Sequence, residues 1–295
     1  LKKYGAPIYV RHEIVHSRHV VNSLRHKGAV FVEELNEVPE GSVVIFSAHG
    51  VAKSVWEEAQ SRRLHVIDAT CPLVIKVHNE VNRDYTQGYE LILIGHAGHP
   101  EVIGTLGQIP DKFHLVSSVK DVESLHVEKT QNLSYVTQTT LSVDECRDIV
   151  EALHRRFPNI KGPHQEDICY ATQNRQNAVK SLSKLVDVIL VIGSPNSSNS
   201  NRLRELGEHC GIPSYLIDAA SDINPDWLKD AKSVGLSAGA SAPEVLVTEV
   251  VAYLKRLGSS EEVEELTVIE EDVEFLLPKE LVTIESASRA SASAN

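Results

Sequence analysis

Two cysteines stand where a strand pattern gives way to a helix pattern. Cys71 lies in Ala-Thr-Cys-Pro directly after an apolar stretch, and Cys169 lies in Asp-Ile-Cys-Tyr ahead of a helical stretch. Because the N-terminus of a helix favours a thiolate, both are candidate functional sulfur atoms. We interpret Cys146 and Cys210, which belong to helical patterns, as structural. The chain has no Cys-x-x-Cys motif, so spacing alone does not identify a metal.

Histidines gather in the loops that follow predicted strands. His49 lies in Ser-Ala-His-Gly, His96 and His99 lie in Gly-His-Ala-Gly-His-Pro-Glu, and His16 is a fourth candidate. A single histidine is more often structural, so it is the convergence of the set that favours function. Glu101 follows His99 by two residues. A carboxyl group partly withdrawn from water can hold a proton near neutral pH and act as a general acid.

Residues 194–201 read Ser-Pro-Asn-Ser-Ser-Asn-Ser-Asn and separate an apolar strand from a helical pattern. Backbone N–H groups and the helix dipole point at whatever binds in such a loop, and its hydroxyls and amides add neutral donors. The loop can therefore hold a phosphate without the lysine of a P-loop. Residues 137–140 and 237–241 are built alike. Capping alone would need one Ser or Asn per helix, whereas residues 194–201 hold seven.

The elements that must position these loops alternate along the chain. Predicted strands cover residues 43–46, 65–67, 91–94, 134–136, 188–192 and 234–236, and predicted helices cover 51–61, 141–157, 175–185, 201–209 and 244–257. Short apolar runs without alternation are typical of parallel strands buried on both faces. We therefore expect an α/β fold with parallel sheets.

The six polar loops fall into three pairs, which predicts three small α/β units. We place them at residues 1–71, 72–165 and 166–257, followed by an acidic C-terminal extension at 258–285 and a disordered tail at 286–295. Ligands of open parallel sheets bind beyond the carboxyl ends of the strands. Three units in a pseudo-threefold arrangement would bring their loops together around a central cavity.

Composition excludes several classes of protein. The 295 residues carry a net charge of −12, and residues 261–280 hold nine acidic side chains and one lysine. We read that run as a solvated face and expect neither nucleic acid nor a membrane surface as a partner. No apolar run reaches the ~20 residues of a membrane span, and no secretory signal is present. Four cysteines indicate a reducing compartment, the cytoplasm of a bacterium or a plastid stroma.

Several motifs occur together in one order along residues 1–280. They are His12-Glu-Ile-Val-His16, Phe46-Ser-Ala-His-Gly-Val51, Asp68-Ala-Thr-Cys-Pro-Leu73, Gly95-His-Ala-Gly-His-Pro-Glu101, Thr137-Gln-Thr-Thr140, Asp167-Ile-Cys-Tyr-Ala-Thr172, residues 193–201 and Ala238-Gly-Ala-Ser-Ala-Pro243. In this set the sequence resembles the 4-hydroxy-3-methylbut-2-enyl diphosphate reductases of the LytB/IspH family. Jointly the motifs are very specific.

The resemblance implies a 4Fe-4S cluster held by three cysteines, with one iron open to the substrate. By motif match, Cys71 and Cys169 are two of the ligands. The third family cysteine lies in a Gly-Phe-Cys-Ala-Gly segment upstream of residues 4–7, and this sequence has no such segment and no methionine. We therefore expect that an N-terminal segment is missing and that the chain as written binds a cluster poorly.

The resemblance also implies the residue roles. The proton-donating glutamate maps onto Glu101, and the contacts to the substrate's diphosphate map onto His16, His49, His99, Thr139, Ser197, Ser198, Asn199 and Ser241. The implied reaction is the reductive removal of an allylic hydroxyl, giving isopentenyl and dimethylallyl diphosphate in the last step of the non-mevalonate pathway. The implied partners are this small diphosphate and an electron donor such as ferredoxin or flavodoxin.

Two other readings of the same residues stay open at this stage. A metal-independent transferase or isomerase acting on phosphates could use residues 194–201 with His99 and Glu101, and would leave Cys71 and Cys169 without a role. A non-catalytic protein on this scaffold would bind a diphosphate and turn nothing over. An iron–sulfur absorption band after anaerobic reconstitution separates both from the reductase.

Overall fold

The computed structural model describes residues 3–110, 113–258, 263–273, 275–276 and 281. Its strands are β1 (Ile8–Arg11), β2 (Ala29–Val32), β3 (Val43–Phe46), β4 (His65–Asp68), β5 (Glu90–Ile94), β6 (Phe113–Val116), β7 (Leu133–Thr137), β8 (Val188–Ile192), β9 (Ser214–Ile217) and β10 (Val234–Ala238). Its α-helices are α1 (Arg18–His26), α2 (Lys53–Ser61), α3 (Pro72–Thr86), α4 (Pro100–Leu106), α5 (Val119–Ser124), α6 (Val143–Arg156), α7 (Tyr170–Leu182), α8 (Ser198–His209) and α9 (Glu244–Arg256).

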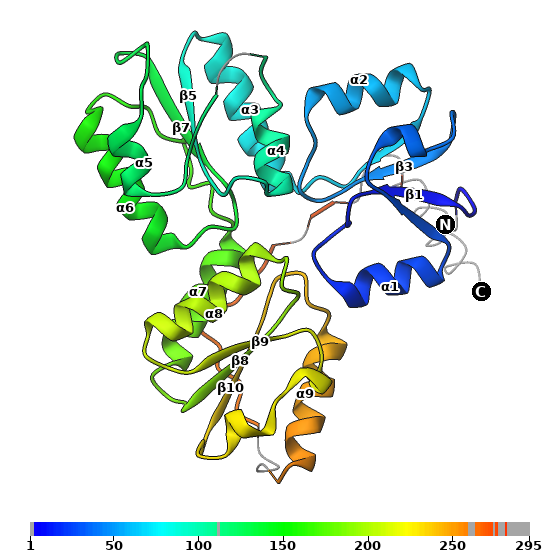
Figure 1. Cartoon of the computed structure of the whole chain (residues 1–295), viewed down its shortest axis with the longest axis vertical. Coiled ribbons are helices and arrows are strands. Elements are labelled where there is room, and N and C mark those ends of the chain that lie inside the picture. Colours follow the sequence, from blue (N-terminus) through cyan, green and yellow to red (C-terminus); the bar gives the residue numbers. More distant parts are fainter. Residues whose placement is uncertain (1–2, 111–112, 259–262, 274, 277–280, 282–295) are drawn as a thin grey trace.

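The strands form three separate sheets, and every strand pair within them is parallel. Figure 1 shows the three sheets as lobes around a common junction, with the first in blue, the second in cyan to green and the third in yellow to orange. The expected α/β fold with three parallel-sheet units is confirmed. The predicted unit boundaries after residues 71 and 165 fall between the sheets and stay a prediction.

The central strands are buried on both faces, as the unbroken apolar runs indicated. In β5, Leu91 and Leu93 pack into one core, and Ile92 and Ile94 pack into another on the opposite face. The same alternation between two cores holds along β8. Successive side chains of a strand point to opposite faces, so a strand needs apolar residues at every position to fill two cores.

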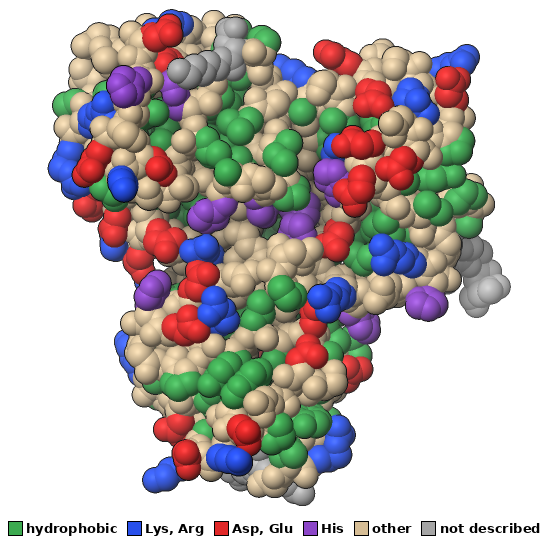
Figure 2. All heavy atoms as spheres, in the orientation of Figure 1, with side chains coloured by type: hydrophobic (Ala, Val, Ile, Leu, Met, Phe, Trp, Pro, Cys, Tyr) green, Lys and Arg blue, Asp and Glu red, His purple; other side chains and the backbone are tan. Residues whose placement is uncertain are grey.

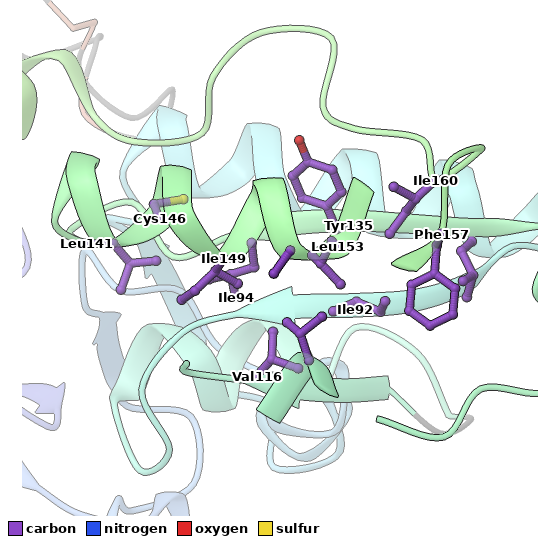
Figure 3. Close-up of a cluster of buried hydrophobic side chains, with 13 residues drawn as sticks. Ile92, Ile94, Val116, Tyr135, Leu141, Cys146, Ile149, Leu153, Phe157 and Ile160 are labelled. Atoms are coloured by element: carbon purple, nitrogen blue, oxygen red, sulfur yellow. The ribbon is translucent and has the colours of Figure 1, made fainter. Parts of the chain in front are cut away.

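Helices cover both faces of the second and third sheets. Residues of α3 and α4 pack on one face of β5 and β7, and α6 packs on the other face, where Cys146 lies among Leu141 and Ile149 (Figure 3). In the third unit, α7 and α8 pack on one face and α9 on the other. Although α3 directly follows the first sheet in the chain, it packs on the second.

The three sheets share one strand order. The first strand of each unit lies in the middle, between the second and the third, giving β2-β1-β3, β6-β5-β7 and β9-β8-β10. The first sheet adds β4 beyond β3. Our sequence analysis paired the loops after residues 46 and 67 in this unit, and that pairing differs from the structure. The loop after β3 pairs with the loop after β1, because β1 is the central strand, and β4 is an additional edge strand that leads to Cys71.

The described part of the acidic extension returns to the third unit. Glu271 accepts a hydrogen bond from Asn174 Nδ2 at 3.0 Å and lies 3.8 Å from the guanidinium of Arg175. The ring of Phe275 lies 6.5 Å from that of Tyr170, centroid to centroid. The predicted tail at 286–295 lies outside the described residues. Among the residues that the structure describes, no helix is both long and apolar enough to cross a bilayer.

The first and second units meet through small residues. An added Cβ at Gly104 would lie 3.0 Å from the carbonyl oxygen of Gly50, and one at Gly107 would lie 2.2 Å from the Cβ of Ala52. The backbone N–H of Lys53 donates to the carbonyl of Gly107 at 3.0 Å. This close approach sets α4, whose first turn carries Glu101, against the loop that carries His49.

We expect Gly107→Ala to lower the free energy of unfolding by about 1–3 kcal/mol, because the new methyl group overpacks this contact. Chemical denaturation measures the change. Ala52→Gly removes the atom that the methyl group meets, and glycine is tolerated at a helix N-cap. The double variant Ala52→Gly/Gly107→Ala should therefore recover most of the loss. A Gly107→Ala variant as stable as the wild type would show that α4 is not held by this contact.

Candidate active site

Six loops from the three units meet at the junction, two from each sheet. In each unit they follow the central strand and its third strand, at the carboxyl ends. Figure 2 shows histidine side chains gathered where the three lobes meet. The six predicted residues on these loops are His16 and His49 in the first unit, His99 and Thr139 in the second, and Ser197 and Ser241 in the third. Topologically equivalent positions therefore supply the site.

Three of the predicted histidines are packed against one another. The ring centroid of His16 lies 4.3 Å from that of His49 and 5.7 Å from that of His99, and His49 and His99 are also 5.7 Å apart. Burial, reinforced by the neighbouring imidazoles, lowers the pKa of His49 to about 3 and that of His99 to about 4. Both rings are therefore neutral at pH 7.

One of these rings has an assigned tautomer. His99 is the N-cap of α4, and its Nδ1 accepts a hydrogen bond from the backbone N–H of Glu101 at 3.2 Å. In a neutral imidazole the other nitrogen then carries the proton, so Nε2 of His99 is a donor. His49 has Nδ1 at 3.2 Å from the hydroxyl of Ser47. Nε2 of His16 is buried without a hydrogen-bond partner among the described residues.

Glu101 is buried in the first turn of α4, with 3% of its surface exposed. The backbone N–H of Thr139 donates to Oε1 at 2.6 Å, and the Thr139 hydroxyl donates to Oε2 at 3.0 Å. Burial raises the pKa of Glu101 to about 7. The two hydrogen bonds from Thr139 lower the pKa, but their effect is smaller than that of burial. The carboxyl group is thus poised to hold or release a proton near neutral pH.

The two predicted thiols lie at helix N-caps from different units. Cys71 caps α3 and Cys169 caps α7, and both are partly exposed. Burial is the largest cause that raises the pKa of Cys71. The charge of Cys169 raises it further, whereas N–H groups of Leu73 and Val74 lower it. The backbone N–H of Cys169 donates to the carbonyl of Thr139 at 2.9 Å, which links this cysteine to the residue that holds Glu101.

The Ser/Asn loop opens α8 as predicted. Ser197 is the N-cap, and its hydroxyl accepts from the backbone N–H of Ser200 at 3.3 Å. Ser198 lies 3.5 Å from the amide nitrogen of Gln138, which connects the third unit to the second. Asn199 is 5% exposed, yet neither its Oδ1 nor its Nδ2 has a partner among the described residues. A buried amide left unpaired is costly, so this side chain is available to hydrogen-bond a polar ligand.

Ser241 joins the third unit to the first, since its hydroxyl donates to the backbone carbonyl of His16 at 3.0 Å. The structure therefore brings all the predicted substrate-binding residues to one junction. It also places Cys71, Cys169 and Glu101 there, through the loops that carry them.

The model of the LytB protein family matches residues 1–255. The chain belongs to the LytB protein family. It is 60% identical over 281 residues to 4-hydroxy-3-methylbut-2-enyl diphosphate reductase 2 of Bradyrhizobium diazoefficiens, covering 95% of this chain and 91% of that protein. It is 60% identical over 283 residues to the reductase of the same name from Aromatoleum aromaticum, covering 96% and 90%.

Solved structures of LytB-type enzymes share the fold. The structure of E-1-hydroxy-2-methyl-but-2-enyl-4-diphosphate reductase from Plasmodium falciparum matches with a TM-score of 0.91 and 37% identity, covering 98% of this chain and 91% of that one. A second structure is titled (E)-4-hydroxy-3-methyl-but-2-enyl diphosphate reductase, the terminal enzyme of the non-mevalonate pathway. It matches with a TM-score of 0.61 and 33% identity, and the match covers 86% of this chain and 90% of that one.

This LytB family member also has site residues that our sequence analysis missed. Lys76 lies five residues beyond Cys71 on α3 and donates to the buried carboxylate of Asp167 at 3.0 Å. The same ammonium group donates to the carbonyls of Gln165 and Glu166 at 2.6 and 3.0 Å. It thus ties the helix that begins after Cys71 to the turn that precedes Cys169. The pairing spans about 90 positions, so no local pattern indicates it.

The other two cysteines lie apart from the junction. Cys146 is buried in the core of the second unit, and burial raises the pKa of its thiol to about 12. Cys210 follows the last residue of α8 and is exposed. Our sequence analysis interpreted both cysteines as structural, and that interpretation stays a prediction; Cys210 is the C-cap of α8.

Burial of Glu101 gives a pH-dependent stability with a definite sign. Its folded-state pKa of about 7 exceeds the model-peptide value of 4.5, so between these values the folded protein binds a proton that the unfolded chain has lost. Stability from this group therefore falls as pH rises from about 4.5 to 7. Glutamine does not titrate, so Glu101→Gln lacks this loss of stability. The free energy of unfolding of the variant minus that of wild type should therefore rise by on the order of 3 kcal/mol from pH 5 to pH 8, as measured by urea unfolding at each pH.

Asp121→Asn serves as the matched control. Hydrogen bonds from Ser117 and Ser118 lower the pKa of Asp121 below 3.8, so its removal should leave the slope between pH 5 and pH 8 unchanged. Parallel pH profiles for wild type and Glu101→Gln would mean that Glu101 is ionised throughout this range.

Proposed function

We propose that this chain reduces 4-hydroxy-3-methylbut-2-enyl diphosphate to isopentenyl and dimethylallyl diphosphate, the last step of the non-mevalonate isoprenoid pathway. The LytB family membership and the reductase relatives support the reaction class. The observation that carries the proposal is the unpaired amide of Asn199, which is buried at a junction of neutral histidines and hydroxyls beside a carboxyl group with a pKa of about 7.

The diphosphate would lie against the six loops. Nε2 of His99 is a donor, and Asn199, Ser197, Ser198 and Ser241 add neutral N–H and O–H groups at the beginning of α8 and the end of β10. Hydrogen bonds from neutral donors to a charged acceptor stabilise a complex by roughly 1.5–3 kcal/mol each. Several such bonds, together with the dipole of α8, hold an anion without an arginine clamp. His16, His49 and Thr139 complete the proposed set.

Glu101 is the proposed proton donor. The reaction takes up two electrons and two protons, breaks the allylic C–O bond and releases water. Protonated Glu101 supplies the proton that leaves with the hydroxyl oxygen, and the second proton adds to either end of the allyl anion. Thr139 holds both carboxyl oxygens, so the acid has a fixed orientation. With a pKa of about 7, Glu101 can give up this proton and regain it from solvent in each cycle.

We propose a 4Fe-4S cluster as the cofactor, with Cys71 and Cys169 as two of its ligands. The two thiols fit this role, since they come from two units, lie at helix N-termini and are close enough for the charge of Cys169 to raise the pKa of Cys71. When bound, the cluster would supply the electrons one at a time and an iron that polarises the substrate hydroxyl. An external donor such as ferredoxin or flavodoxin would reduce it. Four cysteines without a disulfide framework favour the cytoplasm as the compartment.

Glu101→Gln tests the acid. The amide keeps the size and the hydrogen-bonding capacity of the side chain but has no proton to transfer. We expect turnover of the full-length, anaerobically reconstituted protein to fall ~100-fold or more, while the affinity for substrate changes little. Formation of isopentenyl and dimethylallyl diphosphate is the readout. Unchanged turnover would remove Glu101 from the mechanism, and a wild type that binds the diphosphate without converting it would refute the reductase.

Cysteine variants test the cluster. We expect Cys71→Ser and Cys169→Ser to lose most of the iron and acid-labile sulfide that the full-length protein binds, because serine is a poor ligand for iron–sulfur clusters. Cys210→Ser is the matched control, since Cys210 is exposed and lies at the far end of α8. Iron and sulfide per chain are measured after anaerobic reconstitution. Equal iron in all four proteins would contradict the assignment of both ligands.

A further inference from the structure

One carboxylate oxygen contacts two units at the edge of the histidine cluster. Glu13 Oε2 lies 3.2 Å from Nδ1 of His16 and accepts a hydrogen bond from Nδ2 of Asn196 at 2.7 Å. Asn196 belongs to the Ser/Asn loop of the third unit, 183 positions away. We propose that Glu13 is a positioning residue that makes His16 the one histidine of the cluster to take up a proton when the diphosphate binds. This inference rests on the anion site proposed above.

The hydrogen bonds of the three rings distinguish them. His99 accepts at Nδ1 from a backbone N–H, so this ring meets a ligand as a neutral donor. His49 has the neutral hydroxyl of Ser47 at its Nδ1. His16 faces a carboxylate, and a carboxylate accepts only. Nδ1 of His16 therefore carries a proton, and its buried Nε2 can donate to an anion only when the ring is protonated at both nitrogens.

The close packing of the three rings leaves room for one cation in this cluster. The rings are so close that a charge on one opposes a charge on the others, and the charge of His16 is among the causes that lower the pKa values of His49 and His99. Two titratable groups near the cluster have other partners. Arg18 lies 3.2 Å from Asp218, and His12, whose pKa is lowered chiefly by burial, lies 3.7 Å from Glu33. An anion at Nε2 and Glu13 at Nδ1 would flank the imidazolium of His16.

The second hydrogen bond on Glu13 gives it a role in geometry. Asn196 stands next to Ser197, the N-cap of α8, so the carboxylate fixes the Ser/Asn loop relative to His16. A carboxamide in its place could accept the same two hydrogen bonds. It would lack the negative charge that stabilises a protonated ring. Position and charge are therefore separable by substitution.

The test measures proton uptake when inorganic diphosphate binds to the full-length protein. Calorimetric titrations at pH 7.5 in two buffers of different ionisation enthalpy give the number of protons taken up per bound diphosphate. The protonation of the ligand itself is common to all variants, so differences report on the protein. We expect Glu13→Gln to take up about one proton fewer than wild type. It should also bind diphosphate ~10-fold or more weakly, since the charged hydrogen bond from His16 to the anion is lost.

Three further variants keep the outcome decisive. Glu33→Gln removes the carboxylate that faces His12, outside the cluster, and should match wild type. His16→Gln should lose the same proton, and adding Glu13→Gln to it should change neither affinity nor proton uptake, as expected if Glu13 acts through His16. Equal proton uptake by wild type and Glu13→Gln, or by wild type and His16→Gln, would overturn the inference.

These outcomes are independent of the proposed reaction. A wild type that converts substrate while Glu13→Gln retains full proton uptake would refute this role of Glu13 and leave the reductase in place. A wild type that neither binds diphosphate nor turns over would refute the proposed function, and with it the inference. If Glu13→Gln fails to fold by circular dichroism, His16→Gln alone still tests whether the proton is taken up at this ring.

Discussion

The burial of one carboxyl group is the constraint on which the rest of the site depends. Glu101 has left water at the beginning of α4, and among the described residues Thr139 donates a hydrogen bond to each of its oxygens. Removing a carboxylate from water favours the protonated form, which is why a glutamate can serve as an acid at neutral pH. Thr139 also accepts the backbone N–H of Cys169. The acid and a proposed cluster ligand are therefore fixed relative to each other by a single residue.

The same logic governs the anion site. Lysine or arginine at the junction would hold a diphosphate strongly, but would also lower the pKa of Glu101 by its charge. Hydroxyls, amides and neutral imidazoles avoid this conflict before the anion binds, and a proton that His16 takes up with the anion is offset by the anion's own charge. Their cost is visible at Asn199, whose buried amide stays unpaired in the protein alone. A polar group of this kind makes its hydrogen bonds only when ligand is present. It therefore lowers the stability of the folded protein without ligand and strengthens ligand binding.

Much of the fold and of the site could be predicted from local sequence. The apolar runs predicted β3 and β8 with their observed limits. In β8, which is buried on both faces, no polar residue interrupts the pattern. The strand-end loops with His49, His99 and Ser197 followed from the same runs. The predicted helix at 175–185 began five residues late, because the first turn of α7 is polar and has no apolar periodicity. Its beginning is set by Cys169 as N-cap.

What could not be predicted depends on contacts between distant segments. Two such contacts are those of Lys76 with Asp167 and of Glu13 with Asn196. In the sequence these are ordinary charged and polar residues, and their pairing is visible only once the units are placed together. The pairing of β1 with β3 was missed for a related reason. Paired strands in a parallel sheet are separated by a crossover connection. The apolar pattern of a strand therefore indicates that it is buried, but not which strand it pairs with.

The three-unit arrangement has a consequence for synthesis on the ribosome. Each sheet takes its strands from one stretch of chain, so each unit can fold as it emerges, whereas the junction needs contacts as distant as Ser241 with His16, 225 positions apart. At roughly 5–20 residues per second, the first histidines wait on the order of 10–45 s for their last partner. Late in that interval the nascent chain has two complete lobes and an unfinished junction. The capacity to bind the diphosphate therefore arrives late and abruptly, with the last lobe.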